Sequence, residues 1–431
     1  MRSLVLSLLL LGCGDSPRQM PADGALGDGL DDGETTDDAL LDASTDASVT
    51  CDWAKQTIEP FTSGTVDASM VVEPAGLVHV SFTSSSDGDL RYAVRALDGT
   101  WTDVTVDPFA DGVAHSSLVR DAQGGLHISY ITSTGDLRYA TKPAGGAWAT
   151  TTVDPFADGV SHSSLVLDPA GALHISYAVT ASGDLRYATK PAGGTWATAT
   201  VDPFADGVAH SQLVRGADGT LHISYTVSAS GDLRYATKAV AGTWQTTTVD
   251  PFANGVSHST LLIAPDGALH ISYAVPTDGD LRHATKLPTG TWSTTTIDPF
   301  AANVTHSSTI RDSSGGLHIA YAVGGDSDLR YAFMPARGTW TKTTVDPFAS
   351  AASAQLVLDA TGGAHISYAV PGDGDLRYAH KATGGTWMTE TVDPFASGVM
   401  QSAFALDGDR IHIVYGVPGD TDLRYATRCT N

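Results

Sequence analysis

Residues 163–208 read SSLVLDPAGALHISYAVTASGDLRYATKPAGGTWATATVDPFADGV. The stretch contains four short runs, SSLVLD, LHISYAV, DLRYATK and TWATATVD, and turns rich in Gly, Pro, Ser and Asp separate them. Apolar and polar side chains alternate in these runs with the period of two that is typical of β-strands, and the turn residues favour hairpins. The stretch therefore predicts one sheet of four antiparallel strands.

Near-copies of this unit recur with a period of 47 or 48 residues. The phrase Leu-Arg-Tyr-Ala, once written Leu-Arg-His-Ala, begins at Leu90, Leu137, Leu185, Leu233, Leu281, Leu329, Leu376 and Leu423. A tryptophan recurs in register at Trp53, Trp101, Trp148, Trp196, Trp244, Trp292, Trp340 and Trp387. A single four-stranded sheet cannot cover both of its faces, so repeated units of this length pack side by side in a ring. We expect an all-β fold over residues 51–431, an eight-bladed β-propeller of four-stranded antiparallel blades.

The two ends of the repeat array complement each other. The first tryptophan run, residues 53–58, lacks three preceding strands, and the last unit lacks its tryptophan run. We therefore expect the N-terminal strand to complete the eighth blade and close the ring. Cys51 and Cys429 lie just outside the two ends of the array, which in an exported protein predicts a disulfide that locks this closure.

The first thirteen residues, MRSLVLSLLLLGC, combine Arg2, an apolar run and Cys13 directly after a small residue. The run is too short to span a bilayer and predicts a signal peptide. Its ending resembles a bacterial lipobox, which implies that Cys13 carries a lipid; the alternative is an ordinary signal with an incidental cysteine. Residues 14–50 are acidic and contain no aromatic residue, which predicts a disordered tether. We expect an exported protein, lipid-anchored to the bacterial envelope at the outer membrane or cell surface.

The formal charge is -24, with an isoelectric point near 4.7. Nucleic acid and anionic lipid surfaces would be repelled at long range, so no nucleic-acid partner is expected and the lipid is the only expected membrane contact. The second run of every unit carries a histidine, at His79, His127, His174, His222, His270, His318, His365 and His412. Because this position is the same in all units, we expect a hydrogen-bonded structural role there rather than a ligand.

A second set of side chains differs between units and supplies the candidate ligand-binding residues. Where the innermost strand of each blade begins, the aligned residues are Asp67, His115, His162, His210, His258, His306, Ser353 and Gln401. We expect the five histidines to face the mouth of the channel and to contact ligand or water. Alternatively, the histidines could bind a metal in pairs or act as a protonation switch near pH 6.5; because no carboxylate cluster completes a metal site, we expect neither a metal nor a cofactor.

Three further patterns carry predictions. In every unit an aspartate stands two residues before the arginine, as in Asp184 and Arg186, which predicts a local ion pair; the alternative is an arginine that binds a ligand anion. Some turns carry two acids, such as Asp373 and Asp375, and we expect turn caps there, with calcium binding as the alternative. An Asp-Pro-Phe phrase ends most units, and its phenylalanine is expected to pack between blades or, alternatively, to stack on a sugar.

The phrases D-x-x-G-x-L-H-I-S-Y and G-D-L-R-Y-A-T-K with a following G-x-W resemble the sialidase-like, BNR-type repeat propellers of bacterial and archaeal surface proteins. The resemblance covers residues 51–429 and implies the propeller architecture. Sialidases also carry an Arg-Ile-Pro motif and Asp boxes that lead to tryptophan. Here Arg410 and Ile411 precede His412, and the aspartate turns lead to histidine, so the resemblance does not imply sialidase catalysis.

Blades with the same residues argue against a dedicated active site, which needs a few unlike groups at one place. We therefore expect a non-catalytic, monomeric surface module that recognises a carbohydrate or cell-wall polymer at several equivalent sites, like an adhesin or lectin. One alternative is a glycosidase or polysaccharide lyase whose chemistry lies where the symmetry breaks, near Ser353, Gln401 and Asp67. A second alternative is a scaffold that docks a surface protein.

Overall fold

The computed structural model describes residues 51–430 except 61–67, 85, 86, 111, 156, 158, 204, 252, 254, 300, 302, 337, 348, 352, 395, 397, 400 and 409. The predicted signal peptide, Cys13 and the tether lie outside these residues. None of the described residues belongs to a helix that is long and apolar enough to cross a membrane.

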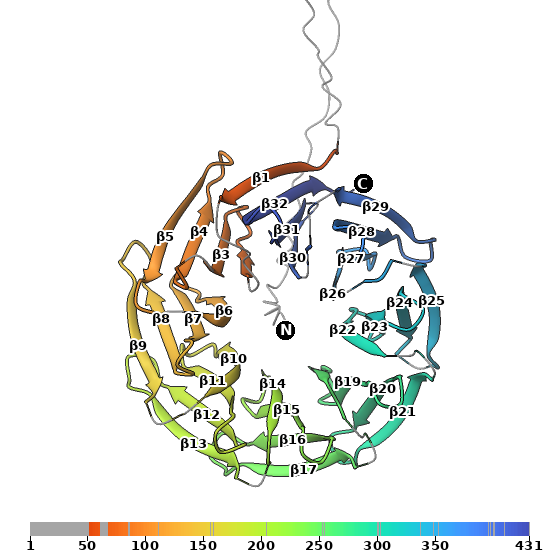
Figure 1. The fold of residues 1–431 in the computed structure, drawn as a ribbon. Helices are drawn as coiled ribbons and strands as arrows, with labels where there is room; N and C mark the ends of the chain where they lie inside the picture. Colours follow the sequence, from red (N-terminus) through yellow and green to blue (C-terminus); the bar gives the residue numbers. More distant parts are fainter. Residues whose placement is uncertain are drawn as a thin grey trace, which may run out of the picture.

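Within the described residues, thirty-two strands form eight four-stranded antiparallel sheets arranged as a ring (Figure 1). Blade 1 contains β2 (Ser69–Val72), β3 (Val78–Thr83), β4 (Leu90–Arg95) and β5 (Trp101–Asp107). Blade 2 contains β6 (Ala114–Arg120), β7 (Leu126–Ile131), β8 (Leu137–Lys142) and β9 (Ala149–Asp154). Blade 3 contains β10 (Val160–Leu167), β11 (Leu173–Val179), β12 (Leu185–Lys190) and β13 (Ala197–Asp202). Blade 4 contains β14 (Val208–Arg215), β15 (Leu221–Val227), β16 (Asp232–Lys238) and β17 (Gln245–Asp250).

The second half of the ring repeats this plan. Blade 5 contains β18 (His258–Ile263), β19 (Leu269–Val275), β20 (Asp280–Lys286) and β21 (Ser293–Asp298). Blade 6 contains β22 (Val304–Arg311), β23 (Leu317–Val323), β24 (Asp328–Met334) and β25 (Thr341–Asp346). Blade 7 contains β26 (Ser353–Leu358), β27 (Ala364–Val370), β28 (Asp375–Lys381) and β29 (Met388–Asp393). Blade 8 contains β30 (Ser402–Asp407), β31 (Arg410–Val417), β32 (Asp422–Cys429) and β1 (Ala54–Glu59).

The ring closes through strand β1, as the sequence predicts. This strand runs antiparallel to β32 as the outermost strand of blade 8, with Ala54 opposite Thr427. Cys51 and Cys429 form a disulfide beyond this pair, and their Cα atoms are 5.3 Å apart. The eight-bladed all-β propeller and its disulfide closure are therefore confirmed.

The apolar core lies between neighbouring blades rather than inside one sheet. One cluster joins Leu137 and Tyr139 of blade 2 to Leu165 and Ile175 of blade 3, and equivalent clusters occupy the other junctions. Strand β27 is buried along its whole length, which reflects cover on both of its faces. Burial from both sides explains why the four-stranded unit is stable only as part of the ring.

An aspartate at the end of the outer strand links each of seven junctions, and its carboxylate is buried at all of them except for the half-buried Asp346. Asp154 at the end of β9 accepts a hydrogen bond from the Tyr177 hydroxyl and forms an ion pair with Arg186 Nη1 of the next blade, both at 2.6 Å. The same tyrosine–aspartate bond, 2.5–2.9 Å long, joins Tyr130 to Asp107, Tyr225 to Asp202, Tyr273 to Asp250, Tyr321 to Asp298, Tyr368 to Asp346 and Tyr415 to Asp393. At the remaining junction Glu59 pairs with Arg91 at 3.1 Å.

The predicted local pair of the repeated arginine forms in blades 4 to 8, and a second partner comes from the preceding blade. In blade 5, for example, Arg282 lies 3.3 Å from Asp280 and 3.1 Å from Asp250. In blade 3 the prediction is wrong, because Arg186 pairs with Asp154 of the preceding blade and not with Asp184. The reason is that the blade packing places the end of the preceding outer strand beside the third strand of the next blade.

The histidine of the second strand has the predicted structural role. His127 Nδ1 is 2.5 Å from the hydroxyl of Tyr139 on the next strand, and the edge of Trp196 from blade 3 packs on the Tyr139 ring at 5.2 Å. The equivalent histidine–tyrosine bond recurs in blades 1, 3, 4, 6, 7 and 8, and blade 5 has His270 bonded to His283 instead. This hydrogen bond orients the aromatic side chain on which the next blade packs.

Candidate functional site

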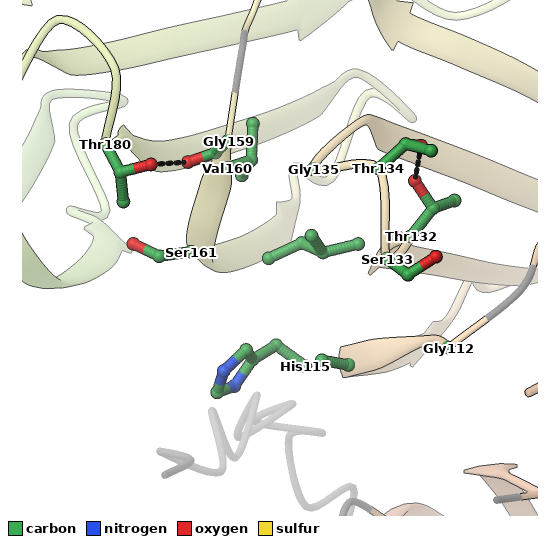
Figure 2. Close-up of a pocket in the computed structure, with 12 residues that line it drawn as sticks. Gly112, His115, Thr132, Ser133, Thr134, Gly135, Gly159, Val160, Ser161 and Thr180 are labelled. Atoms are coloured by element: carbon green, nitrogen blue, oxygen red, sulfur yellow. Dashed lines mark hydrogen bonds between the residues drawn. The ribbon is translucent and has the colours of Figure 1, made fainter.

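A cavity of about 450 Å³ opens between blades 2 and 3 (Figure 2). One wall is the turn 132–135 that joins β7 to β8, and the opposite wall is the start of β10 together with Thr180. His115, near the start of the innermost strand β6, closes one side. Two consecutive blades therefore supply the cavity, and neither forms it alone.

The turn of blade 2 that lines the cavity is shorter than its counterpart in blade 3. The segment from Tyr130 to Leu137 reads YITSTGDL, one residue shorter than the corresponding YAVTASGDL of blade 3. The pairing of β6 with β7 contains a bulge, because Ala114 pairs with Ile131 but Ser117 pairs with Ser129, and a one-residue register change also occurs in blades 3, 4 and 6. His115 falls within this bulge and has a φ of 52°, a left-handed conformation that non-glycine residues adopt uncommonly.

Glycines let the two walls approach closely. A Cβ atom on Gly159, whose φ is 73°, would lie 2.3 Å from Thr180 Oγ1. A Cβ atom on Gly135, with a φ of 80°, would lie 2.5 Å from the Cα of Gly159. Neither position tolerates a larger residue without movement, so the shape of the cavity depends on both glycines.

Hydroxyl groups dominate the polar lining. Figure 2 shows that the Thr132 and Thr134 hydroxyls, 2.8 Å apart, are hydrogen-bonded, and that Thr180 donates to the Gly159 carbonyl at 2.6 Å. Thr134 also lies 2.9 Å from the Asp136 carboxylate. These bonds fix the orientation of the threonine side chains, and each hydroxyl oxygen keeps a lone pair for a further donor.

The lining carries no formal charge at neutral pH. None of the twelve lining residues is Asp, Glu, Lys or Arg, and His115 is the only titratable side chain among them. Such a surface can donate and accept hydrogen bonds with a neutral polyol. It supplies neither the two carboxylates of a glycosidase nor a cation to neutralise an acidic substrate.

The five predicted histidines lie next to one another on the innermost strands. The distances between ring centres are 4.7 Å for His115 and His162, 4.4 Å for His162 and His210, 4.7 Å for His210 and His258, and 4.9 Å for His258 and His306. We call these five residues the histidine arc. Only His115 of the arc lines the cavity.

Burial lowers the pKa values of four arc histidines, His162, His210, His258 and His306. Burial is the main cause for His162, and the imidazoles of His210 and His115 lower its pKa further. The pKa of His258 falls for the same reasons, with His210 and His306 as neighbours. These four histidines are therefore neutral at pH 7.

The remaining candidates are placed apart from the cavity. Ser353 is buried at the start of β26, Gln401 is half-buried just before β30, and Asp67 lies outside the described residues. The cavity therefore lies between blades 2 and 3, and not at blades 7, 8 and 1, where the residues aligned with the histidines differ. The cavity residues Thr132, Ser133 and Thr134 form the turn before the Asp-Leu-Arg-Tyr-Ala phrase of blade 2, and no residue of this turn was singled out from the sequence, although the 47-residue spacing at this unit signals a shortened turn.

The acidic turns contact arginine. Asp278 lies 2.6 Å from Arg282, and Asp373 lies 2.6 Å from Arg377, and in each case the aspartate precedes the arginine by four positions. Among the described residues no group of three or more His, Cys, Asp or Glu side chains is arranged to hold a metal ion. In these turns the aspartate four positions before the arginine therefore forms a further ion pair with the arginine that binds the carboxylate of the preceding blade.

Phe109 is 84% exposed, so the expected packing between blades is wrong for this residue. Pro108 follows the last residue of β5, and the Asp107 side chain accepts a hydrogen bond from the Phe109 amide at 3.2 Å, which turns the chain away from the junction. The phenylalanines of the other units' Asp-Pro-Phe phrases lie outside the described residues.

Solved β-propellers share the fold. Virginiamycin B lyase from Staphylococcus aureus has a TM-score of 0.50 at 14% identity, covering 74% of this chain and 95% of its own. An ulvan lyase gives 0.49 at 13%, covering 78% and 96%, and the six-bladed fucose-recognising lectin of Aleuria aurantia gives 0.40 at 15%, covering 68% and 98%. No family model and no curated protein matches the sequence. At these identities the likeness establishes the fold alone.

Proposed function

We propose that this protein is a non-catalytic surface module that binds neutral carbohydrate, with the cavity between blades 2 and 3 as a binding site. The observation that supports it is the composition of the lining, in which hydroxyls, backbone groups and one imidazole surround about 450 Å³ without a formal charge. Sugar hydroxyls both donate and accept hydrogen bonds, so they match such a lining.

The overall charge favours a neutral ligand. With a formal charge of -24 the protein repels polyanions, including the uronic-acid polymers that polysaccharide lyases cleave. Lyase chemistry also requires a group that neutralises the uronate and a base that removes its α-proton, and the lining offers only His115 for both tasks. The residues of this cavity therefore suit the binding of a carbohydrate better than the elimination reaction of a polysaccharide lyase.

The proposed setting follows from the N-terminal sequence. A lipid on Cys13 would hold the propeller at the cell envelope through the acidic segment 14–50, and the monomeric propeller would present its cavity outside the cell. Mass spectrometry of the mature protein tests this proposal directly. A mature chain that begins at a diacylated Cys13 supports it, and an unmodified cysteine contradicts it.

Binding to an array of neutral and anionic glycans tests the proposed function. We expect saturable binding of neutral glycans, and loss of that binding in Ser161→Trp, which fills the cavity. Thr151→Trp is the matched control, because Thr151 lies exposed on the outer strand β9 of the same structure, away from the cavity. Absence of glycan binding, or equal binding by both variants, would refute the assignment. Unsaturated uronate products would establish a lyase instead.

A further inference from the structure

His306 of the histidine arc contrasts with the second histidine of its blade and with two other arc members, since His162 and His258 each have Nδ1 3.2 Å from the hydroxyl of the preceding serine. In blade 6, His318 has both ring nitrogens in contact, with the Tyr331 hydroxyl at 2.5 Å and with Asp312 at 3.0 Å. His306 of the same blade has both ring nitrogens buried without a hydrogen-bond partner. Burying a polar group without a partner is unfavourable, so a ligand from outside the chain that bonds to the ring nitrogens of His306 would be stabilising.

The spacing of the arc suits imidazoles that share an ion. For a metal–nitrogen bond of about 2.0–2.1 Å and an angle of about 90–110° between ligands, two imidazole ring centres lie roughly 4.5–5.2 Å apart. The four neighbouring pairs of the arc are 4.4–4.9 Å apart, at or close to this range. The strands that carry these pairs, β6, β10, β14, β18 and β22, are the innermost strands of consecutive blades (Figure 1).

We propose that neighbouring imidazoles of the histidine arc bind divalent transition-metal ions, such as Zn²⁺ or Cu²⁺, between adjacent blades. No described group of three metal-binding side chains is arranged around one point, so each ion takes two imidazoles from the protein and completes its coordination with water. Five rings in separate pairs accommodate at most two ions.

Charge and ligand chemistry both favour this class of ion. Neutral imidazole nitrogen selects Zn²⁺ and Cu²⁺ over Ca²⁺ and Mg²⁺, which prefer oxygen ligands. The formal charge of -24 raises the local concentration of cations around the protein. The proposed metal sites overlap the proposed glycan cavity only at His115, and the other four histidines of the arc lie outside its lining.

Titration of the purified full chain, prepared without a histidine tag, with Zn²⁺ in a calorimeter tests the proposal. We expect saturable binding of one or two ions per chain and no comparable response to Ca²⁺. The double variant His162→Gln/His258→Gln leaves three histidines of the arc but no neighbouring pair, so it should lose the saturable binding. Circular dichroism and thermal unfolding establish that the variant is folded.

The chain offers a matched control in the same two blades. His174→Gln/His270→Gln removes the same number of histidines from the second strands of blades 3 and 5, and it should keep the stoichiometry of the unaltered protein. Electron paramagnetic resonance of the unaltered protein with Cu²⁺ adds a readout that needs no variant, because two imidazole ligands give a nitrogen hyperfine pattern. Absence of saturable binding, equal losses in both double variants, or a Cu²⁺ spectrum without imidazole nitrogen would overturn the proposal.

Discussion

Tyr177 donates its hydroxyl to Asp154 across the junction between blades 2 and 3, with 2.6 Å between the two oxygens. Both residues are buried, and burial raises the pKa of Tyr177 far above its usual value, so the hydroxyl remains a donor at all ordinary pH values. Asp154 also holds Arg186, so one carboxylate fastens two strands of the next blade. The junction between blades 8 and 1 differs at both positions, with Glu59 in place of the aspartate and Phe82 in place of the tyrosine.

The first prediction concerns this hydrogen bond. Tyr177→Phe should lower the free energy of unfolding by about 1 to 3 kcal/mol, because the buried Asp154 carboxylate loses a donor while its bond to Arg186 remains. Urea denaturation followed by tryptophan fluorescence measures the change. Thr151→Ala, on the exposed face of β9, serves as the control and should change stability by no more than about 0.5 kcal/mol. Equal midpoints for the two variants would show that the bond contributes nothing.

The second prediction concerns the closing disulfide. Cys51→Ser/Cys429→Ser should lower the free energy of unfolding by about 2 to 5 kcal/mol, because the crosslink restricts the unfolded chain across 378 residues of sequence separation. Strand β1 would then be held mainly by its pairing with β32 and by the ion pair of Lys55 with Asp393. Reductant should destabilise the unaltered protein to the same extent and leave the double variant unchanged. A reductant effect on the double variant would point to another cause.

The third prediction concerns pH. Burial lowers the pKa of His412 to about 4 and that of His283 to about 3, whereas both titrate near 6.5 when the chain is unfolded. Between these values the unfolded state binds more protons, so the free energy of unfolding falls as the pH falls from about 6.5 to about 4. Each such histidine contributes a slope of up to about 1.4 kcal/mol per pH unit. Urea midpoints from pH 7.5 to 4.5 measure this slope.

A variant separates His412 from the other titrating groups. His412→Gln keeps a polar side chain near Tyr425, which bonds His412 Nδ1 at 2.7 Å, and removes one proton-binding site. The slope of the free energy of unfolding against pH should therefore be smaller in the variant by up to about 1.4 kcal/mol per pH unit, which corresponds to one bound proton. An unchanged slope would mean that His412 titrates alike in the folded and unfolded chains.

The fourth prediction concerns the cavity wall. Gly159→Ala combines a left-handed backbone with a Cβ atom 2.3 Å from Thr180 Oγ1, whereas Gly193→Ala, at a φ of 68°, meets nothing within 4 Å. In both variants the left-handed backbone conformation should lower the free energy of unfolding by about 1 to 2 kcal/mol. Gly159→Ala should be destabilised further, because Thr180 must move to make room for the new Cβ atom. Thermal unfolding gives the comparison, and glycan binding should weaken only in Gly159→Ala. Equal effects of the two substitutions on both measurements would count against a close approach of Gly159 to Thr180.

The architecture was predictable from the sequence because it depends on local patterns. Four alternating runs with turn residues define a sheet, the even recurrence of Trp196 and its equivalents counts eight units, and the complementary ends at Cys51 and Cys429 imply closure. The structural role of His127 was also predictable, because a residue present in every unit serves the unit. These signals lie within one repeat or at its ends.

The contacts between blades depend on the three-dimensional packing. Arg186 meets Asp154, 32 residues earlier, rather than the nearby Asp184, because the preceding outer strand ends beside it. The sequence shows that the turn after Tyr130 is one residue short, but only the folded chain shows that His115 adopts a left-handed φ and that a cavity opens between this turn and blade 3. The sequence of each repeat alone determined the four strands of its blade. The tertiary structure determined which side chains of different repeats are in contact, because those atoms become neighbours only after the ring has closed.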